Sequence, residues 1–195
     1  MHIEKWFPTI IGYDFYPNHQ KNQNYFIDRA YEIEKNVERG GKGWLSDGVY
    51  NTADGQYNIL NDNMFSNLNK WVSKTVGKFV DDCGMVVTLQ PIDSWINIYR
   101  KGDFQEYHNH PDSFISAIYI VDTPTENASR VYFQSPLLEQ VTIHYTKFEN
   151  KPTSHIEYKP PPGTLLIFRS YINHCVTQHL SDKNRISIAY NFHKI

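Results

Sequence analysis

The sequence predicts a mainly β protein with flanking helices, on the strength of three observations. Two helical patterns occupy the first part of the chain, and from Met85 onward the apolar residues follow the period of two that is typical of strands. Clusters of proline, glycine, aspartate and asparagine separate these short strands, as in sandwiches and closed barrels of the jelly-roll type. The order of helices before strands favours a β core braced by N-terminal helices.

Length and composition limit the architecture and the setting. The 195 residues contain no linker, which predicts one domain over residues 1–195, with residues 1–84 as helical support and residues 85–195 as the β core. A formal net charge of -2 gives no strong nucleic-acid signal, and no apolar run approaches the roughly 20 residues that cross a membrane. The two isolated cysteines favour a reducing, cytoplasmic setting. If the protein oligomerises, we expect a homodimer, because dimers are the commonest oligomers.

Before the β core, the pattern predicts one edge strand and two helices. The apolar residues 6–11 suit an edge strand, where Pro8 is tolerated. Apolar spacings of three and four predict a helix over residues 18–39, with an asparagine cap, and a second helix over residues 62–80. The turn-rich residues 42–60 between them suit either a lid or a packed Ω-loop.

Histidines in the β part carry the first chemical signal. His108 and His110 leave the same face of an extended backbone, so the pair can bind one metal ion. His174 follows a predicted strand and is the best-placed third ligand, and eleven residues later Arg185 and Ser187 share one face of the final strand. A metal beside a cation and a hydroxyl suits a bound dicarboxylate. The other histidines lack a partner at ligand spacing and are expected at the surface or hydrogen-bonded internally: His2, His19, His144, His155, His179 and His193.

These residues resemble those of the Fe(II)- and 2-oxoglutarate-dependent dioxygenases, a family built on the double-stranded β-helix, or jelly-roll, core. The resemblance covers roughly residues 95–192. It rests on four features in the right order, namely Asn97-x-Tyr99, Gly102 followed six residues later by His108, the distal His174, and Arg185-x-Ser187. It implies an enzyme that uses Fe(II), 2-oxoglutarate and dioxygen to hydroxylate a protein side chain or a small molecule.

The sequence allows two different sets of iron ligands. The family usually binds iron through a His-x-Asp or His-x-Glu pair plus a distal histidine, but here His110 stands at the carboxylate position. Either His108, His110 and His174 form a three-histidine face, or the register shifts by two and His110 with Asp112 supplies the ordinary pair. Pro111 keeps the second reading feasible. A neutral imidazole in place of a carboxylate raises the charge of the iron site by one unit, which favours an anionic keto acid.

The resemblance also implies the residues that bind the co-substrate. Arg185 with Ser187 would hold the far carboxylate of 2-oxoglutarate, because a buried guanidinium needs an anion; a salt bridge to an internal acid is the alternative. Asn97 and Tyr99 would hydrogen-bond the co-substrate. Tyr119, on the strand after the histidine pair, is expected to reach it as well.

Two other functions are compatible with the same pattern. A cupin-like metalloenzyme would use the three histidines without 2-oxoglutarate, although Arg185-x-Ser187 argues against it. A non-catalytic jelly-roll binding or structural module would show no keto-acid turnover, and the fold alone does not separate it from an enzyme. Residues 135–158, polar and irregular apart from residues 141–145, are expected to form part of the rim that meets the unidentified primary substrate.

Overall fold

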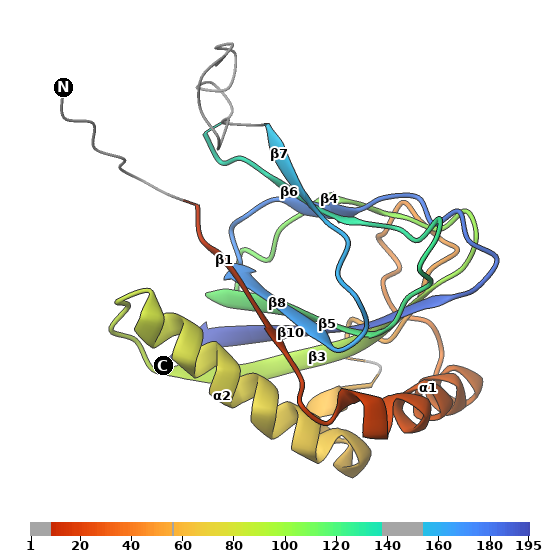
Figure 1. Cartoon of the computed structure of the whole chain (residues 1–195), viewed down its shortest axis with the longest axis horizontal. Coiled ribbons are helices and arrows are strands. Elements are labelled where there is room, and N and C mark those ends of the chain that lie inside the picture. The colour runs from red at the N-terminus through yellow and green to blue at the C-terminus, as the bar shows by residue number, and fades with distance from the viewer. Residues whose placement is uncertain (1–8, 56, 138–153) are drawn as a thin grey trace.

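In the computed structural model, which describes residues 9–55, 57–137 and 154–195, two antiparallel sheets face each other (Figure 1). The larger sheet has the order β1 (Ile11–Phe15), β8 (Thr164–Arg169), β5 (Ile115–Asp122), β10 (Arg185–Lys194), β3 (Leu89–Tyr99) and β2 (Tyr50–Asn51). The smaller sheet has the order β4 (Gln105–His108), β9 (His174–Val176), β6 (Val131–Gln134) and β7 (His155–Tyr158). This arrangement confirms the predicted mainly β jelly-roll core.

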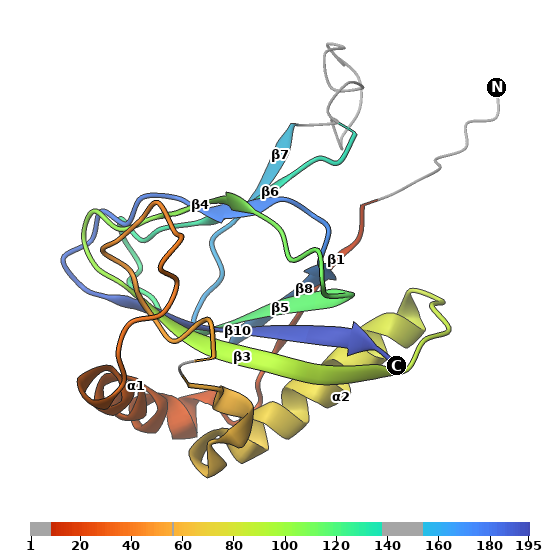
Figure 2. The ribbon, with the colours of Figure 1, turned by 180° about the vertical axis from the view of Figure 1, so that it is seen from behind.

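Two helices, α1 (His19–Asn36) and α2 (Ser66–Asp82), cover the outer face of the larger sheet, and Figure 2 shows both beneath β3 and β10 from the opposite side. Their apolar stripes are buried against the sheet, with Phe26 of α1 and Leu68 of α2 in the same cluster as Ile188 of β10. Burial of each such side chain contributes about 1.5–3 kcal/mol, so packing against the sheet supplies most of the stability of these helices. The predicted bracing by N-terminal helices is thus present.

Alternation along β10 separates this core from the space between the sheets. The residues that face the helices are apolar and almost fully buried: Ile186, Ile188, Tyr190 and Phe192. Arg185, Ser187 and Ala189 face the other way and line a pocket between the two sheets. The phase predicted for this strand from the sequence is therefore correct.

The N-terminal elements differ from the prediction at their ends. The edge strand β1 begins at Ile11, where it pairs with Phe168, and residues 1–8 lie outside the described residues. Helix α1 ends at Asn36, three residues early, because Val37 adopts an extended backbone, and the Asn18 side chain at the other end makes no capping hydrogen bond. Strands β1 and β2 also come from the part of the chain that was assigned to helical support. The extent of the single domain stays a prediction.

The loop between the helices is packed rather than open along most of its length. Ser46, Val49 and Ala53 are buried, and the Arg39 guanidinium donates to the carbonyl oxygens of Val49 and Ser46 at 2.7 and 2.8 Å. Residues 50–51 also form β2 against β3. Of the two alternatives predicted for residues 42–60, the packed loop therefore agrees with the structure better than the lid. Residues 138–153, with the predicted segment 141–145, lie outside the described residues.

Asp62 joins three parts of the N-terminal region. The predicted second helix begins at Ser66 and not at Asp62, because two 3-10 turns, η1 (Ile59–Asn61) and η2 (Asn63–Phe65), precede it. The Asp62 carboxylate accepts from the Met64 amide at 2.9 Å, from Arg29 Nε at 2.9 Å and from the Tyr57 hydroxyl at 2.8 Å. Burial acts to raise the pKa of Asp62, but these hydrogen bonds outweigh it and hold the pKa below its usual value.

None of the helices among the described residues combines the length and the apolar composition needed to cross a membrane.

Replacing Asp62 by asparagine keeps an acceptor for the Met64 amide but removes the charge that pairs with Arg29. We expect the free energy of unfolding at neutral pH to fall by about 1.5–3 kcal/mol, the range for hydrogen bonds to charged groups. Because the folded pKa is lowered, this stabilisation is complete above the ordinary value of 3.8 and disappears as the pH falls through the folded value. Urea unfolding across this pH range measures it; the same acid dependence in both proteins would contradict the prediction.

Candidate functional site

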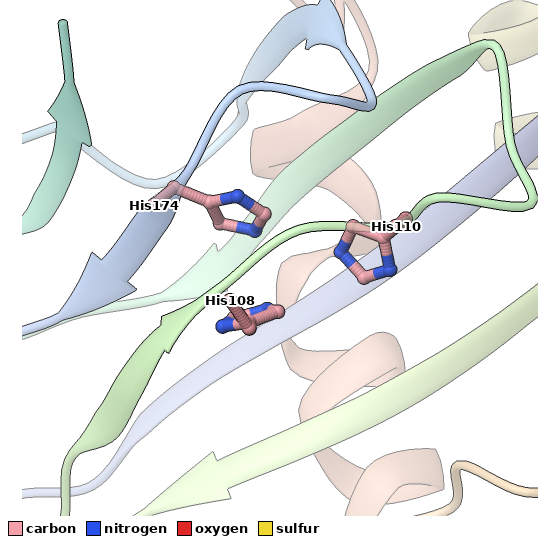
Figure 3. Close-up of side chains that lie close together, drawn as sticks. All are labelled: His108, His110 and His174. Carbon is pink, nitrogen blue, oxygen red and sulfur yellow. The ribbon is translucent and has the colours of Figure 1, made fainter. Parts of the chain in front are cut away.

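Strand pairing brings the three candidate metal ligands together. Gly102, at a positive φ of 97°, turns the chain from β3 into β4, and the pairing of β4 with β9 sets His108 directly opposite His174. His110 follows β4, and its backbone N–H donates to the Ser170 carbonyl at 2.9 Å. The ligand nitrogens of the three histidines all lie within 4.8 Å of one another, and Figure 3 shows the rings around one shared space.

Backbone carbonyls fix the orientation of two of the rings. His108 Nδ1 lies 2.8 Å from the Glu106 carbonyl oxygen, and His174 Nδ1 lies 3.0 Å from that of Ile172. A carbonyl oxygen only accepts, so Nδ1 carries the proton in both rings and Nε2 keeps its lone pair. That tautomer presents Nε2 as a metal ligand.

All three imidazoles are held neutral by their surroundings. Burial lowers the pKa of His108, and the Glu106 carbonyl opposes this shift only partly. Burial, helped by the neighbouring His108, lowers the pKa of His110 to about 4, and burial with both neighbouring rings lowers that of His174 well below its usual value. Neutral imidazole is the form that coordinates a metal ion. The cluster therefore has the protonation state that metal binding requires.

Asp112 is placed differently from the histidines. It is exposed in the turn that the His110 carbonyl closes with the Ser113 amide at 3.0 Å, and it is not part of the cluster of potential ligands. Pro111 precedes it in this turn and sets the backbone for it. The geometry therefore favours the three-histidine reading over the pair of His110 and Asp112.

The cluster opens into the pocket between the sheets, where the space between atoms amounts to about 450 Å³ when the part open to solvent is counted. Among the described residues, no aspartate or glutamate lines it, and Arg185 is its one Lys or Arg side chain. Besides the three histidines, the lining includes Trp44, Trp95, Asn97, Tyr99, Gln105, Ser116, Ile118, Arg185, Ser187, Ala189 and Asn191.

Arg185 is a buried cation without a counter-ion. It is 1% exposed, and Nη1 donates to Ser187 Oγ at 3.4 Å while Nη2 has no hydrogen-bond partner. Its Cζ lies 5.0 Å from the centre of the Tyr99 ring. Burial lowers the pKa of Arg185, but a guanidinium still stays protonated at neutral pH. No ion pair of Arg185 is found within the described parts of the chain, which disfavours the internal salt bridge.

Asn97 and Tyr99, which were predicted to hydrogen-bond the co-substrate, lie on the strand next to this cation. In the pairing of β3 with β10, Asn97 stands opposite Ser187 and Tyr99 opposite Arg185. The Asn97 side-chain oxygen is buried without a partner. Burial raises the pKa of Tyr99 to about 12, against the opposing effect of Arg185, so its hydroxyl keeps its proton at neutral pH and can donate a hydrogen bond.

The predicted contact of Tyr119 with the co-substrate is wrong, because Tyr119 lies on the opposite face of the larger sheet. Its hydroxyl is 2.7 Å from Nδ1 of His19, and its ring packs against those of Tyr16, Phe26 and Trp71 under the helices. It does not line the pocket. Strand β5 is buried on both faces, so its nearly continuous apolar sequence gives no alternation from which to assign a face.

Trp44 and Gln105 line the pocket and were not identified from the sequence. Trp44 belongs to the loop before β2, where no periodic pattern indicates which side chains face inward. Gln105 is three residues from His108, so strict alternation puts the two on opposite faces. An irregularity in the pairing of β4 with β9 between these residues brings both into the pocket. An irregularity of this kind has no clear sequence signal.

A family model described as "Putative 2OG-Fe(II) oxygenase" matches residues 93–191, just over half of the 195-residue chain. The chain belongs to this family. The matched segment contains the three histidines, Arg185 and Ser187. The oxygenase is accordingly an Fe(II)- and 2-oxoglutarate-dependent dioxygenase, as the sequence resemblance implied.

Solved structures share the fold of the oxygenase at low sequence identity. A prolyl-4-hydroxylase from Pseudomonas putida superposes with a TM-score of 0.64 at 11% identity, over 96% of this chain and 94% of that one. A viral collagen prolyl hydroxylase from Paramecium Bursaria Chlorella virus-1, solved with 2-oxoglutarate, gives 0.60 at 14%, over 92% and 94%. HygX from Streptomyces hygroscopicus, solved with nickel, 2-oxoglutarate and hygromycin B, gives 0.62 at 11%, over 95% and 83%. No curated protein sequence matches the chain.

The correction at Tyr119 has a direct test in Tyr119→Phe. Loss of the hydroxyl leaves Nδ1 of His19 without its buried partner, so we expect the free energy of unfolding to fall by about 1–3 kcal/mol. The dissociation constant for 2-oxoglutarate, measured by calorimetry on Mn(II)-loaded protein, should stay within about twofold of the wild type, because the residue faces the helices. A clear loss of 2-oxoglutarate affinity in a stably folded variant would return Tyr119 to the co-substrate site.

Proposed function

We propose that the oxygenase binds its iron through His108, His110 and His174 and hydroxylates a protein side chain or a small molecule. The observation that carries the proposal is the meeting of two features in one pocket. Three neutral imidazoles converge there, and a buried guanidinium without a counter-ion lies in the same space. The first suits a divalent metal ion, and the second suits the anionic co-substrate that the family uses.

The donor set fits iron and the co-substrate together. His108, His110 and His174 would hold the iron through three imidazole nitrogens, and a metal with only three protein ligands could also bind the keto acid and dioxygen. Iron in this position supplies the activation of dioxygen that the oxidative decarboxylation of 2-oxoglutarate and the hydroxylation require. The imidazoles are neutral, so the protein adds no negative charge that would oppose a dianionic acid.

The remaining pocket residues have the positions that binding of this acid needs. Arg185 offers the unpartnered Nη2, and Ser187 lies next to it on the same face, so together they provide donors for the far carboxylate. The protonated Tyr99 hydroxyl is a further donor on the neighbouring strand. Asn97 stands between this end and Trp95 and directs an amide into the pocket. The two sheets bury these side chains, and the low local dielectric strengthens each hydrogen bond.

Arg185 is the residue that argues against the alternatives. A cupin-like enzyme that binds its substrate through the metal alone has no need of a cation buried at 1% exposure. A structural module would gain from replacing such a residue by an apolar one, because an unpaired buried charge is destabilising. Homodimer formation, a cytoplasmic location and the lack of a strong nucleic-acid signal stay predictions from charge, cysteine content and the general frequency of dimers.

The ligand set can be tested by adding Fe(II) and then 2-oxoglutarate to the protein without oxygen, and following the visible absorption band of the chelate. We expect the band in the wild type and in Asp112→Ala, and its loss in His110→Ala, because only His110 belongs to the cluster. Loss in both variants with a silent His108→Ala would move the site to His110, Asp112 and His174. A wild type that binds iron without forming the band would contradict the use of 2-oxoglutarate.

Arg185 should control the affinity for the co-substrate without affecting the metal. We expect Arg185→Gln to raise the dissociation constant for 2-oxoglutarate at least about tenfold, the effect of losing a charge-assisted bond. The dissociation constant of Arg185→Lys should lie between those of the wild type and Arg185→Gln, since lysine keeps the charge but not the bidentate geometry. Mn(II) affinity serves as the internal control. Arg100→Gln is the matched control, because Arg100 is exposed and pairs with Glu34; equal effects of the two Arg→Gln changes would rule out the assigned role.

A further inference from the structure

Gln105 lies at the same end of the pocket as Arg185. In the pairing of β4 with β9 it stands opposite Val176, and Val176 packs in one cluster with Tyr99, the cross-strand partner of Arg185. Gln105 is 4% exposed and lines the pocket from the smaller sheet, whereas Arg185 lines it from the larger one. The two side chains therefore border the space for the far carboxylate from the two sheets.

The amide of Gln105 has a fixed orientation. Its Nε2 donates to Oε2 of Glu106 at 2.9 Å, and its Oε1 is buried without a hydrogen-bond partner. Turning the amide over would set its oxygen against the carboxylate, which only accepts. With one N–H of Nε2 directed at Glu106, the unpartnered amide oxygen is left as an acceptor toward the pocket.

Glu106 is itself held in place from the other side. Its Oε1 accepts from the Leu45 backbone N–H at 2.9 Å, so both carboxylate oxygens are engaged. Leu45 follows Trp44, which forms part of the pocket wall. The Glu106 side chain thus ties the loop before β2 to the amide of Gln105.

An acceptor at this position does not match 2-oxoglutarate by itself. The dianion has no hydrogen to donate, so the amide oxygen and a carboxylate would repel each other unless a donor lay between them. We propose that Gln105 is a further co-substrate-binding residue, which holds a water molecule that donates to its Oε1 and to the far carboxylate. Glu106 is the positioning residue that sets the amide. This inference rests on the proposed function, because it requires the co-substrate to bind next to Arg185.

The role of Glu106 leads to an unusual expectation for Glu106→Gln. The new amide accepts from the Leu45 N–H with its oxygen, as the carboxylate does, and turns its NH₂ toward Gln105. Two donors then face each other, so Gln105 turns over, gives its oxygen to that NH₂ and directs its own N–H into the pocket. A direct hydrogen bond to the co-substrate carboxylate replaces the bridging water. We expect 2-oxoglutarate to bind about tenfold more tightly, the effect of one bond to a charged group.

A double-mutant cycle tests the inference by calorimetry of 2-oxoglutarate binding to full-length, Mn(II)-loaded protein. The cycle compares the wild type with Gln105→Leu, Glu106→Gln and the double variant. We expect weaker binding in Gln105→Leu, by about fivefold for the loss of a water-mediated bond, and tighter binding in Glu106→Gln. In the double variant the gain in 2-oxoglutarate affinity should vanish, because residue 105 no longer carries an amide that can turn over. Gln105→Met, which keeps the length of the side chain, is the second probe if Gln105→Leu does not fold.

The controls separate this inference from the proposed function. Gln178→Leu, at an exposed glutamine, and the Mn(II) affinity of every variant should stay within about twofold of the wild type. A gain in Glu106→Gln that persists without the Gln105 amide would overturn the inference, because the effect would then come from the lost charge of Glu106. The inference would also be overturned if the wild type binds 2-oxoglutarate and both single variants bind it with the same affinity. A wild type that does not bind 2-oxoglutarate would overturn the proposed function together with this inference.

Discussion

The pairing of β4 with β9 is the constraint on which the site depends. It sets His108 opposite His174, and the irregularity within it brings Gln105 to the same face. Both of these histidines donate from Nδ1 to a carbonyl two residues earlier in the chain, so the backbone that makes the sheet also fixes the tautomers. A displacement of one strand by one residue would turn one of these two rings out of the pocket. The chemistry of the site is thus determined by strand register more than by any single side-chain contact.

The larger sheet serves two purposes because its faces differ. One face is apolar and packs under α1 and α2, and this packing stabilises the fold. The other face carries polar groups that the fold does not satisfy, namely Nη2 of Arg185, Oδ1 of Asn97 and Nε1 of Trp95. Each of these groups destabilises the free protein, since burying a polar group without a partner costs about 1–3 kcal/mol. The apolar packing between the sheet and the two helices offsets this cost. The helices thus stabilise a fold that carries unpaired polar groups in its pocket.

The sequence predicted the parts of this arrangement that leave a periodic or local signal. The phase of β10 was readable because polar Arg185 and Ser187 alternate with isoleucines, and the spacing of His108 and His110 was readable as a pair. Tyr119 was assigned to the wrong face because β5 is buried on both sides. Gln105 was missed because its inward position depends on an irregular pairing that sequence alternation does not show.

Ala189 leaves space in the wall of the pocket at the centre of the larger sheet. It lies in one row of the larger sheet between Trp95 and Ile118, directs only a methyl group into the pocket, and is less buried than its neighbours on β10. A larger side chain there would take up pocket volume without reaching the helix-facing core, which lies on the other side of the sheet. The width of the cavity at this row of the sheet is therefore set by the side chain of residue 189.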